Sequence, residues 1–321
     1  MLTRVKIQNF KSVRGLEFSP KRVNVFIGEP NTGKSNLVEA LAVFSEGIYE
    51  NSDIFQDVLR FKTVADLFFD HDLSETVRVL SDGLDWSLKL ESTQFNGTYL
   101  ASNTSGAKFS LTHSGQLQIF QYPEPRTRYY RFKTLSNFNE SRFGTLRAPY
   151  GSNLVALLTT NKRLGRLVDD LFWERGLRLL IDPEKNELNL AKVVERRLYS
   201  YSYPTISETL RRIVFFMAIL ETNRNSVLLL DEPEANTFPF YTTYLAERIA
   251  LDESNQFFLT THNPYVLGSL VGKTPVKDLA VFVTVMEEFC TRLKPISAEG
   301  LSRILEYGPD AFLNLGKLVE G

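Results

Sequence analysis

One octapeptide restricts what this chain can fold into more than any other feature. Residues 28–35 read Gly-Glu-Pro-Asn-Thr-Gly-Lys-Ser and match the phosphate-binding pattern G-x-x-x-x-G-K-[ST] at every fixed position. An apolar run at 23–27 precedes the pattern, and apolar residues with helical spacing follow it from Lys34. A strand, a glycine-rich loop and a helix in this order predict a phosphate site, because backbone N–H groups and the helix N-terminus then face one anion. The alternative is a chance glycine turn before a helix.

The pattern assigns a role to its polar side chains. Lys34 is expected to reach the β- and γ-phosphate oxygens, and the Ser35 hydroxyl is expected to bind Mg²⁺. The predicted nucleotide-binding residues are Gly28, Glu29, Pro30, Asn31, Thr32, Gly33, Lys34, Ser35 and Asn36.

A second apolar run ends in two adjacent carboxylates. Residues 227–232 read Val-Leu-Leu-Leu-Asp-Glu, which predicts a buried strand followed by Asp231 and Glu232. Carboxylates at the end of a buried strand are costly unless a cation pairs with them, and Mg²⁺ would supply that charge. We therefore expect Asp231 to hold Mg²⁺ together with Ser35, and Glu232 to act as the general base that orients or deprotonates the attacking water. The alternative is a helix N-cap before Pro233.

A histidine ends a third apolar run. Residues 256–262 read Gln-Phe-Phe-Leu-Thr-Thr-His. Ligands of open α/β sheets bind beyond the carboxyl ends of the strands, so His262 is predicted to face the γ-phosphate as a polar contact or sensor. The alternative is a loop histidine next to a helix start at Asn263. The predicted catalytic residues are thus Lys34, Glu232 and His262.

The apolar patterns predict different architectures at the ends and in the middle of the chain. After about residue 205, helices and apolar strands alternate, which indicates a parallel or mixed central sheet with flanking helices. Between about 60 and 135, short alternating runs with turn signals at 96–97, 105–106 and 114–115 predict an antiparallel meander. We expect a discontinuous ATPase-type lobe at 1–50 and 200–321. An insertion at 51–200 would interrupt it, with strands at about 60–135 and a helical part at about 150–200.

Composition excludes several classes of protein. Lys and Arg total 37 and Asp and Glu total 38, so the chain as a whole is not a strongly basic nucleic-acid-binding protein. The single cysteine, Cys290, excludes an intrachain disulfide and a cysteine zinc cluster. No window reaches the roughly 18 apolar residues of a membrane span, and the N-terminus lacks a signal-peptide core. We expect a soluble, cytoplasmic protein that makes no membrane contact.

Four segments together make the chain resemble the ABC-type AAA family ATPases of the RecF, SMC, Rad50 and OLD group. They are residues 4–12, the phosphate loop continued through 36–41, residues 230–234, and the pair Thr261-His262. The resemblance covers about 1–45 and 200–290 and is nearest to compact OLD-like ATPases without a nuclease domain. It implies an α/β fold of the P-loop NTPase, ABC-ATPase type, with ATP and Mg²⁺ as cofactors. It also implies a head-to-tail homodimer that forms with ATP.

In this family, a Ser-x-Gly stretch of one subunit contacts the γ-phosphate held by the other. The equivalent segment here is 203–212, and the resemblance implies Ser207 as the contact in trans. Glu208 stands about where the glycine is expected. With Thr205 it forms a capping-box pattern that would turn the carboxylate back onto its own helix.

Two further motifs of the family are altered or not located. After Glu234 the chain reads Ala-Asn-Thr-Phe-Pro, where relatives often read Glu-x-x-Leu-His-Pro. This segment normally crosses the dimer interface. The candidates for the glutamine loop are Gln56, Gln118 and Gln121.

The resemblance implies ATP hydrolysis that controls a partner in DNA repair or maintenance, or in anti-phage defence. About 60 residues follow His262 and lack an Asp-x-Asp cluster, so nuclease or toxin activity is expected on a separate soluble effector. The alternatives are a nucleotide-binding scaffold that hydrolyses little, which Glu208 favours, and a transporter nucleotide-binding subunit. DNA is a candidate ligand of residues 126–133, where cations alternate with tyrosines. The same residues also fit an edge strand with charged outward side chains.

Overall fold

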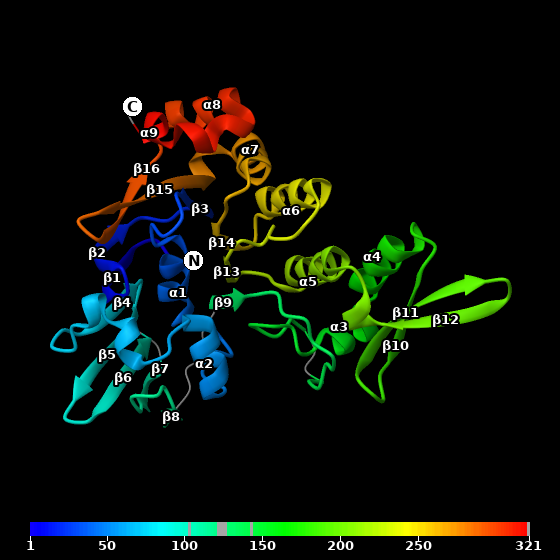
Figure 1. Cartoon of the computed structure of the whole chain (residues 1–321), viewed down its shortest axis with the longest axis horizontal. Helices are drawn as coiled ribbons and strands as arrows, with labels where there is room; N and C mark the ends of the chain where they lie inside the picture. The colour runs from blue at the N-terminus through cyan, green and yellow to red at the C-terminus, as the bar shows by residue number, and fades with distance from the viewer. Residues whose placement is uncertain (102–103, 121–126, 142–143, 320–321) are drawn as a thin grey trace.

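The computed structural model describes residues 1–101, 104–120, 127–141 and 144–319, and it contains three sheets with helices packed around them (Figure 1). Across these ranges, every helix is too short or too polar to span a bilayer.

The central sheet carries the ends of the three motif-bearing strands. It consists of β3 (Val23–Gly28), β9 (Thr127–Tyr130), β13 (Val227–Leu230), β14 (Gln256–Thr260), β15 (Leu279–Glu287) and β16 (Cys290–Pro295). The spatial order is β16-β15-β3-β14-β13-β9, with all neighbours parallel except β15 and β16. Both faces of these strands are covered, which requires nearly continuous apolar runs such as 23–27 and 227–230. The carboxyl ends of β3, β13 and β14 therefore meet at one edge.

The second sheet is an antiparallel meander joined to the N-terminal hairpin. Its strands are β1 (Val5–Phe10), β2 (Val13–Phe18), β4 (Val77–Ser81), β5 (Leu84–Glu91), β6 (Gln94–Ala101), β7 (Thr104–Leu111) and β8 (Leu117–Ile119). Their order is β2-β1-β4-β5-β6-β7-β8. The predicted meander is thus confirmed, and β1 extends it by pairing with β4.

One of the three predicted turns in the meander is correct. Gly115 has a positive φ of 84°, and the segment closes with a bond from Thr112 N to Gln116 O of 3.1 Å. The turns predicted at 96–97 and 105–106 are wrong, because these residues lie inside β6 and β7. Gly97 pairs with Phe109 across the strands, and a Cβ there would lie 2.0 Å from the Phe109 ring. The glycine therefore makes room for an aromatic ring and does not turn the chain.

The helices fill the space on both sides of the central sheet. The phosphate-loop helix α1 (Lys34–Ala42) shares one core with the meander and one face of the central sheet, so it lies between two sheets (Figure 1). The opposite face is covered mainly by α5 (Glu208–Thr222), α6 (Pro239–Leu251), α7 (Pro264–Lys273) and α8 (Ala298–Tyr307). The remaining α-helices are α2 (Ser52–Leu59), α3 (Leu154–Thr160), α4 (Lys162–Trp173) and α9 (Leu315–Val319). Short 3-10 helices are η1 (Val64–Leu67), η2 (Phe69–His71), η3 (Tyr203–Thr205), η4 (Val276–Asp278) and η5 (Gly308–Asn314).

Segment 51–200 is woven into the rest of the molecule. Its strand β9 pairs with β13 in the central sheet, and its strand β4 pairs with β1 in the meander. The part expected to be helical, about 150–200, is helical only in α3 and α4. It continues as a third sheet of β10 (Arg178–Asp182), β11 (Glu187–Val194) and β12 (Arg197–Ser202), in that order. In Figure 1 the β11–β12 hairpin extends away from the other elements. The helical prediction fails at β11 because polar and apolar residues alternate from 187 to 190, which is the period of a strand.

Candidate nucleotide site

A pocket of about 420 Å³ opens where β3, β13 and β14 end. It brings together three motifs, the first of which lies 196 residues before the second, counted from Ser35 to Asp231. Its lining residues are Ser12, Pro30, Asn31, Gly33, Lys34, Ser35, Asn36, Arg60, Glu232 and His262.

The phosphate loop wraps around the start of α1 in a conformation that needs glycine. Gly33 has a φ of 91°, and a Cβ on it would lie 2.0 Å from Thr291 Oγ1. Lys34 follows at the first helical position and is only 5% exposed. Its ammonium donates to the carbonyls of Gly28 (3.0 Å) and Glu29 (2.6 Å). Burial lowers the pKa of Lys34, while the Glu232 and Asp231 carboxylates oppose that shift.

Asp231 and Ser35 meet as the sequence predicts. Ser35 Oγ donates to Asp231 Oδ1 at 3.0 Å, and Thr260 Oγ1 donates to the same oxygen at 2.7 Å. Thr260 Oγ1 in turn accepts from the backbone N–H of Glu232 at 2.9 Å, which ties the ends of β13 and β14 together. Among the described residues, no cluster of three or more His, Cys, Asp or Glu side chains could hold a metal alone. The hydroxyl and carboxylate pair fits Mg²⁺, which usually takes one or two protein ligands with phosphate and water oxygens.

Glu232 and His262 face each other across the open part of the pocket. Their side chains are 44% and 40% exposed, and His262 Nε2 lies 3.3 Å from Glu232 Oε1. Burial, with a smaller contribution from the Lys34 charge, lowers the pKa of His262, so the imidazole is neutral near pH 7. Glu232 has a φ of 44°, an uncommon conformation for this residue type. The N-cap alternative for these carboxylates is wrong, because the next helix, α6, begins only at Pro239.

Sequence reasoning missed Arg60, which lines the same pocket. It follows α2, and its guanidinium lies 3.5 Å from Asp231 Oδ2 while also pairing with Glu39. Glu39 is 1% exposed and pairs with Lys11 as well, so this buried carboxylate of α1 is bound by two cations, of which Arg60 is partly exposed to the pocket. No local pattern marks Arg60, because its role depends on the return of α2 to the site. Ser12, in contrast, belongs to the N-terminal segment that carried the family resemblance.

Glu234 is a second missed residue, although it lies in the motif at 230–234. It is 7% exposed, and its Oε1 accepts from Thr261 Oγ1 (2.5 Å) and from His262 N (3.2 Å). Its Oε2 has no hydrogen-bond partner within the described ranges. Burial raises the pKa of Glu234 to about 7. This carboxyl therefore holds the backbone that presents His262 to the pocket.

The raised pKa of Glu234 predicts a pH-dependent stability. The unfolded chain releases this proton near pH 4.5 and the folded chain near pH 7. The folded state therefore binds more protons in this window, and the free energy of unfolding falls as pH rises through it. Because each pH unit corresponds to about 1.4 kcal/mol, we expect the free energy of unfolding of the wild type to fall by about 3 kcal/mol relative to that of Glu234→Gln between pH 4.5 and 7. Urea denaturation of both proteins at several pH values measures this difference. A difference that stays constant with pH would contradict the assignment.

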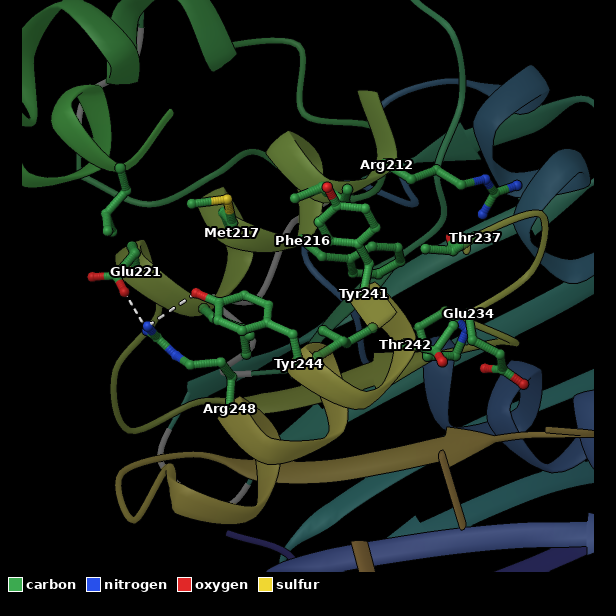
Figure 2. A pocket seen from close by; sticks show the side chains of 15 residues that line it. Arg212, Phe216, Met217, Glu221, Glu234, Thr237, Tyr241, Thr242, Tyr244 and Arg248 are labelled. Carbon is green, nitrogen blue, oxygen red and sulfur yellow. Dashed lines mark hydrogen bonds and ion pairs between the residues drawn. The ribbon is translucent and has the colours of Figure 1, made fainter. Parts of the chain in front are cut away.

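A second pocket lies behind the carboxylate motif, between α5 and α6 (Figure 2). Arg248 closes one end through an ion pair with Glu221 and a 3.4 Å bond to Tyr244 Oη. The volume of this pocket, about 20 Å³, is room for about one water, so the pocket cannot accept a nucleotide.

The predicted contact in trans lies outside the nucleotide pocket of its own chain. Ser207 is exposed and directly precedes α5, with no capping bond from its side chain. The predicted capping box is wrong, because Thr205 Oγ1 donates to Ser202 O instead of capping α5. The Glu208 carboxylate accepts from Arg212 Nε at 2.8 Å and from Asn236 Nδ2 at 3.3 Å. Arg212 thus neutralises the charge that would repel a triphosphate.

The two described glutamine candidates, Gln56 and Gln118, do not reach the pocket. Gln56 donates to Ser114 O at 2.6 Å, and Gln118 lies in β8; neither lines the pocket. Gln121 lies outside the described residues.

Within the basic and aromatic stretch at 126–133, the described residues Thr127–Tyr130 form strand β9 of the central sheet. Tyr129 and Tyr130 are buried, and the Arg128 guanidinium binds Glu46, Asn223 and Ser226. The edge-strand interpretation is confirmed, because β9 is the last strand of the sheet. Base stacking on these tyrosines is excluded by their burial, and Arg126 lies outside the described residues.

Fold and pocket together have the architecture of a P-loop NTPase of the ABC-ATPase type. The structure is similar to an SMC head bound to the C-winged helix domain of ScpA, with TM-score 0.55 and 12% identity, covering 93% of this chain and 98% of that one. It is also similar to a Pyrococcus furiosus SMC head with an extended coiled coil bound to the C-terminal domain of ScpA. There the TM-score is 0.54 and the identity 11%, covering 95% of this chain and 98% of that one. These likenesses confirm the predicted fold class.

The family follows from the sequence profile. Residues 23–268 match the family described as "AAA domain, putative AbiEii toxin, Type IV TA system", and the chain belongs to this family. No curated protein matches the chain. The predicted resemblance to ABC-type AAA ATPases of the RecF, SMC and Rad50 group is confirmed.

Proposed function

We propose that this chain binds Mg·ATP in the pocket of about 420 Å³ and hydrolyses it to ADP and phosphate. The observation that carries the proposal is the meeting of Lys34, Glu232 and His262 around one pocket, from three separate segments. The buried Lys34 ammonium is held ready for the β- and γ-phosphates, at the N-terminus of α1. Mg²⁺, held by Ser35 and Asp231, would neutralise charge on the phosphate oxygens.

The carboxylate of Glu232 is placed to accept a proton from water. The carboxylate lies at the open side of the pocket. The neighbouring His262 imidazole is neutral, so it does not form a charged ion pair that would lower the basicity of Glu232. His262 then orients the water or contacts the γ-phosphate through its N–H.

We further propose that ATP joins two copies head to tail, with Ser207 of one copy completing the site of the other. Ser207 is exposed, lies outside its own pocket, and has a neutralised neighbour in Glu208. Such a dimer would act in the cytoplasm on a soluble effector or nuclease in DNA maintenance or anti-phage defence. The family description names a toxin and a toxin–antitoxin system, and the SMC heads were solved with ScpA domains, which supports a protein partner. A scaffold that hydrolyses little is the second candidate, favoured by the missing glycine at Glu208.

Light scattering tests the dimer. The Glu232→Gln variant is expected to shift from 36.7 kDa to twice that mass only when Mg·ATP is added. Adding Ser207→Arg is expected to prevent the shift by placing a bulky side chain at the interface. Ser302→Arg, on the exposed side of α8, is the matched control and is expected to leave it unchanged. An unchanged mass despite ATP binding would overturn the dimer and favour the scaffold.

A further inference from the structure

The β11–β12 hairpin carries a face on which cations and tyrosines alternate. Side chains on a strand alternate between its two faces, and directly paired residues share a face. The register pairs Lys192 with Tyr199, Leu190 with Tyr201, and Val194 with Arg197. These side chains therefore lie together, and we call the set Lys192, Val194, Arg197, Tyr199 and Tyr201 the tyrosine face.

The tyrosine face is free. Tyr199 and Tyr201 are 45% and 47% exposed, whereas Leu190 beside Tyr201 is fully buried and anchors the base of the hairpin. The side chains of Lys192, Arg197, Tyr199 and Tyr201 make no hydrogen bond or ion pair with any residue in the described ranges. These cations and rings are therefore available to bind another molecule.

Charge is separated between the two faces of this sheet. The strand acids Asp182 and Glu187 are paired with each other and lie on the opposite face, with Ala191 and Arg178. The tyrosine face has two cations and no acid, and its exposed rings are about 6.7 Å apart along β12. By contrast, the tyrosines of the basic stretch in β9, Tyr129 and Tyr130, are buried.

We propose that the tyrosine face binds single-stranded nucleic acid. Lys192 and Arg197 would pair with backbone phosphates, and the two rings would each stack on one base. A duplex is disfavoured because its bases are already stacked on one another. The two most exposed aliphatic residues of the hairpin, Val193 and Leu198, lie on the other face, and only the less exposed Val194 lies on the tyrosine face, so a protein partner is disfavoured there. This binding goes beyond the proposed ATPase and does not depend on it.

Fluorescence anisotropy of labelled dT20 and U20, measured with the purified chain without nucleotide, tests the proposal. Tyr199→Ala/Tyr201→Ala is expected to weaken binding at least about tenfold, and Tyr199→Phe/Tyr201→Phe is expected to retain it. Lys192→Gln/Arg197→Gln is expected to make the salt dependence shallower by roughly 1.4 in the log–log slope. Tighter binding of dT20 would identify DNA as the preferred ligand, and tighter binding of U20 would identify RNA.

A matched control comes from the other side of the same hairpin. Val193→Ala/Leu198→Ala removes exposed apolar side chains of comparable accessibility and is expected to leave oligonucleotide binding unchanged. If wild type binds neither oligonucleotide, or if both faces contribute equally, the proposal is overturned and the hairpin is better explained as a protein contact. Because no nucleotide is present, these results are independent of ATP hydrolysis.

Discussion

The Lys34→Ala variant is expected to lose ATP binding. The substitution removes the only ammonium of the phosphate loop, which donates to the Gly28 and Glu29 carbonyls and is aimed at the pocket. Charged hydrogen bonds contribute about 1.5–3 kcal/mol each, so losing those to two phosphates weakens binding at least about a hundredfold. Isothermal titration calorimetry with Mg·ATP measures the change.

Stability separates this loss from unfolding. Burial of Lys34 is itself unfavourable, so alanine is expected to leave the melting temperature near that of wild type. Lys62→Ala removes an exposed lysine outside the pocket and is the matched control, with ATP affinity expected to be unchanged. Wild-type affinity in Lys34→Ala would disprove the assignment of the loop.

The Glu232→Gln variant is expected to bind ATP and to lose turnover. The amide keeps the shape of the side chain but cannot accept a proton, and general-base catalysis contributes about 10²–10⁴-fold. Since Glu232 is 44% exposed and its side chain contacts mainly His262, the fold has little reason to change. Steady-state phosphate release is therefore expected to fall by about 10²–10⁴-fold, while the dissociation constant for ATP stays unchanged.

His262→Ala provides the comparison for the base. It removes the side chain that faces Glu232 but leaves the carboxylate, so its loss of phosphate release is expected to be smaller. Undiminished hydrolysis by Glu232→Gln would assign the base elsewhere, whereas equal losses in both variants would indicate that the two side chains act as a unit.

The sequence predicts those parts of the site whose geometry is local. A strand, a glycine-rich loop and a helix determine where Lys34 and Ser35 lie relative to each other, and the strand ends at Asp231 and His262 follow from the parallel sheet. Arg60 depends on how α2 folds back, and no local pattern contains that information.

The errors arise from contacts that the local patterns do not contain. Gly97 has the composition of a turn residue, but its role is to admit the Phe109 ring from the next strand. Thr205 and Glu208 have the spacing of a capping box, but Arg212 and Asn236 bind the carboxylate instead. At Gly97 a ring from the neighbouring strand decides the local structure, whereas Glu208 is bound by Arg212 one turn further along the same helix and by Asn236.

The weaving of the middle segment has a consequence for the molecule as a whole. Strand β9 covers the edge of β13, the strand that ends at Asp231, and Arg60 reaches that same carboxylate from α2. Both come from the part of the chain that separates the two halves of the nucleotide site. The middle segment is therefore part of the folded unit: a chain reduced to its two ends would leave one edge of the buried strand β13 unpaired and would remove the Arg60 guanidinium from Asp231. Because the middle segment and the nucleotide site share a strand edge and an ion pair, we expect a conformational change in the middle segment to alter nucleotide binding, and nucleotide binding to alter the conformation of the middle segment.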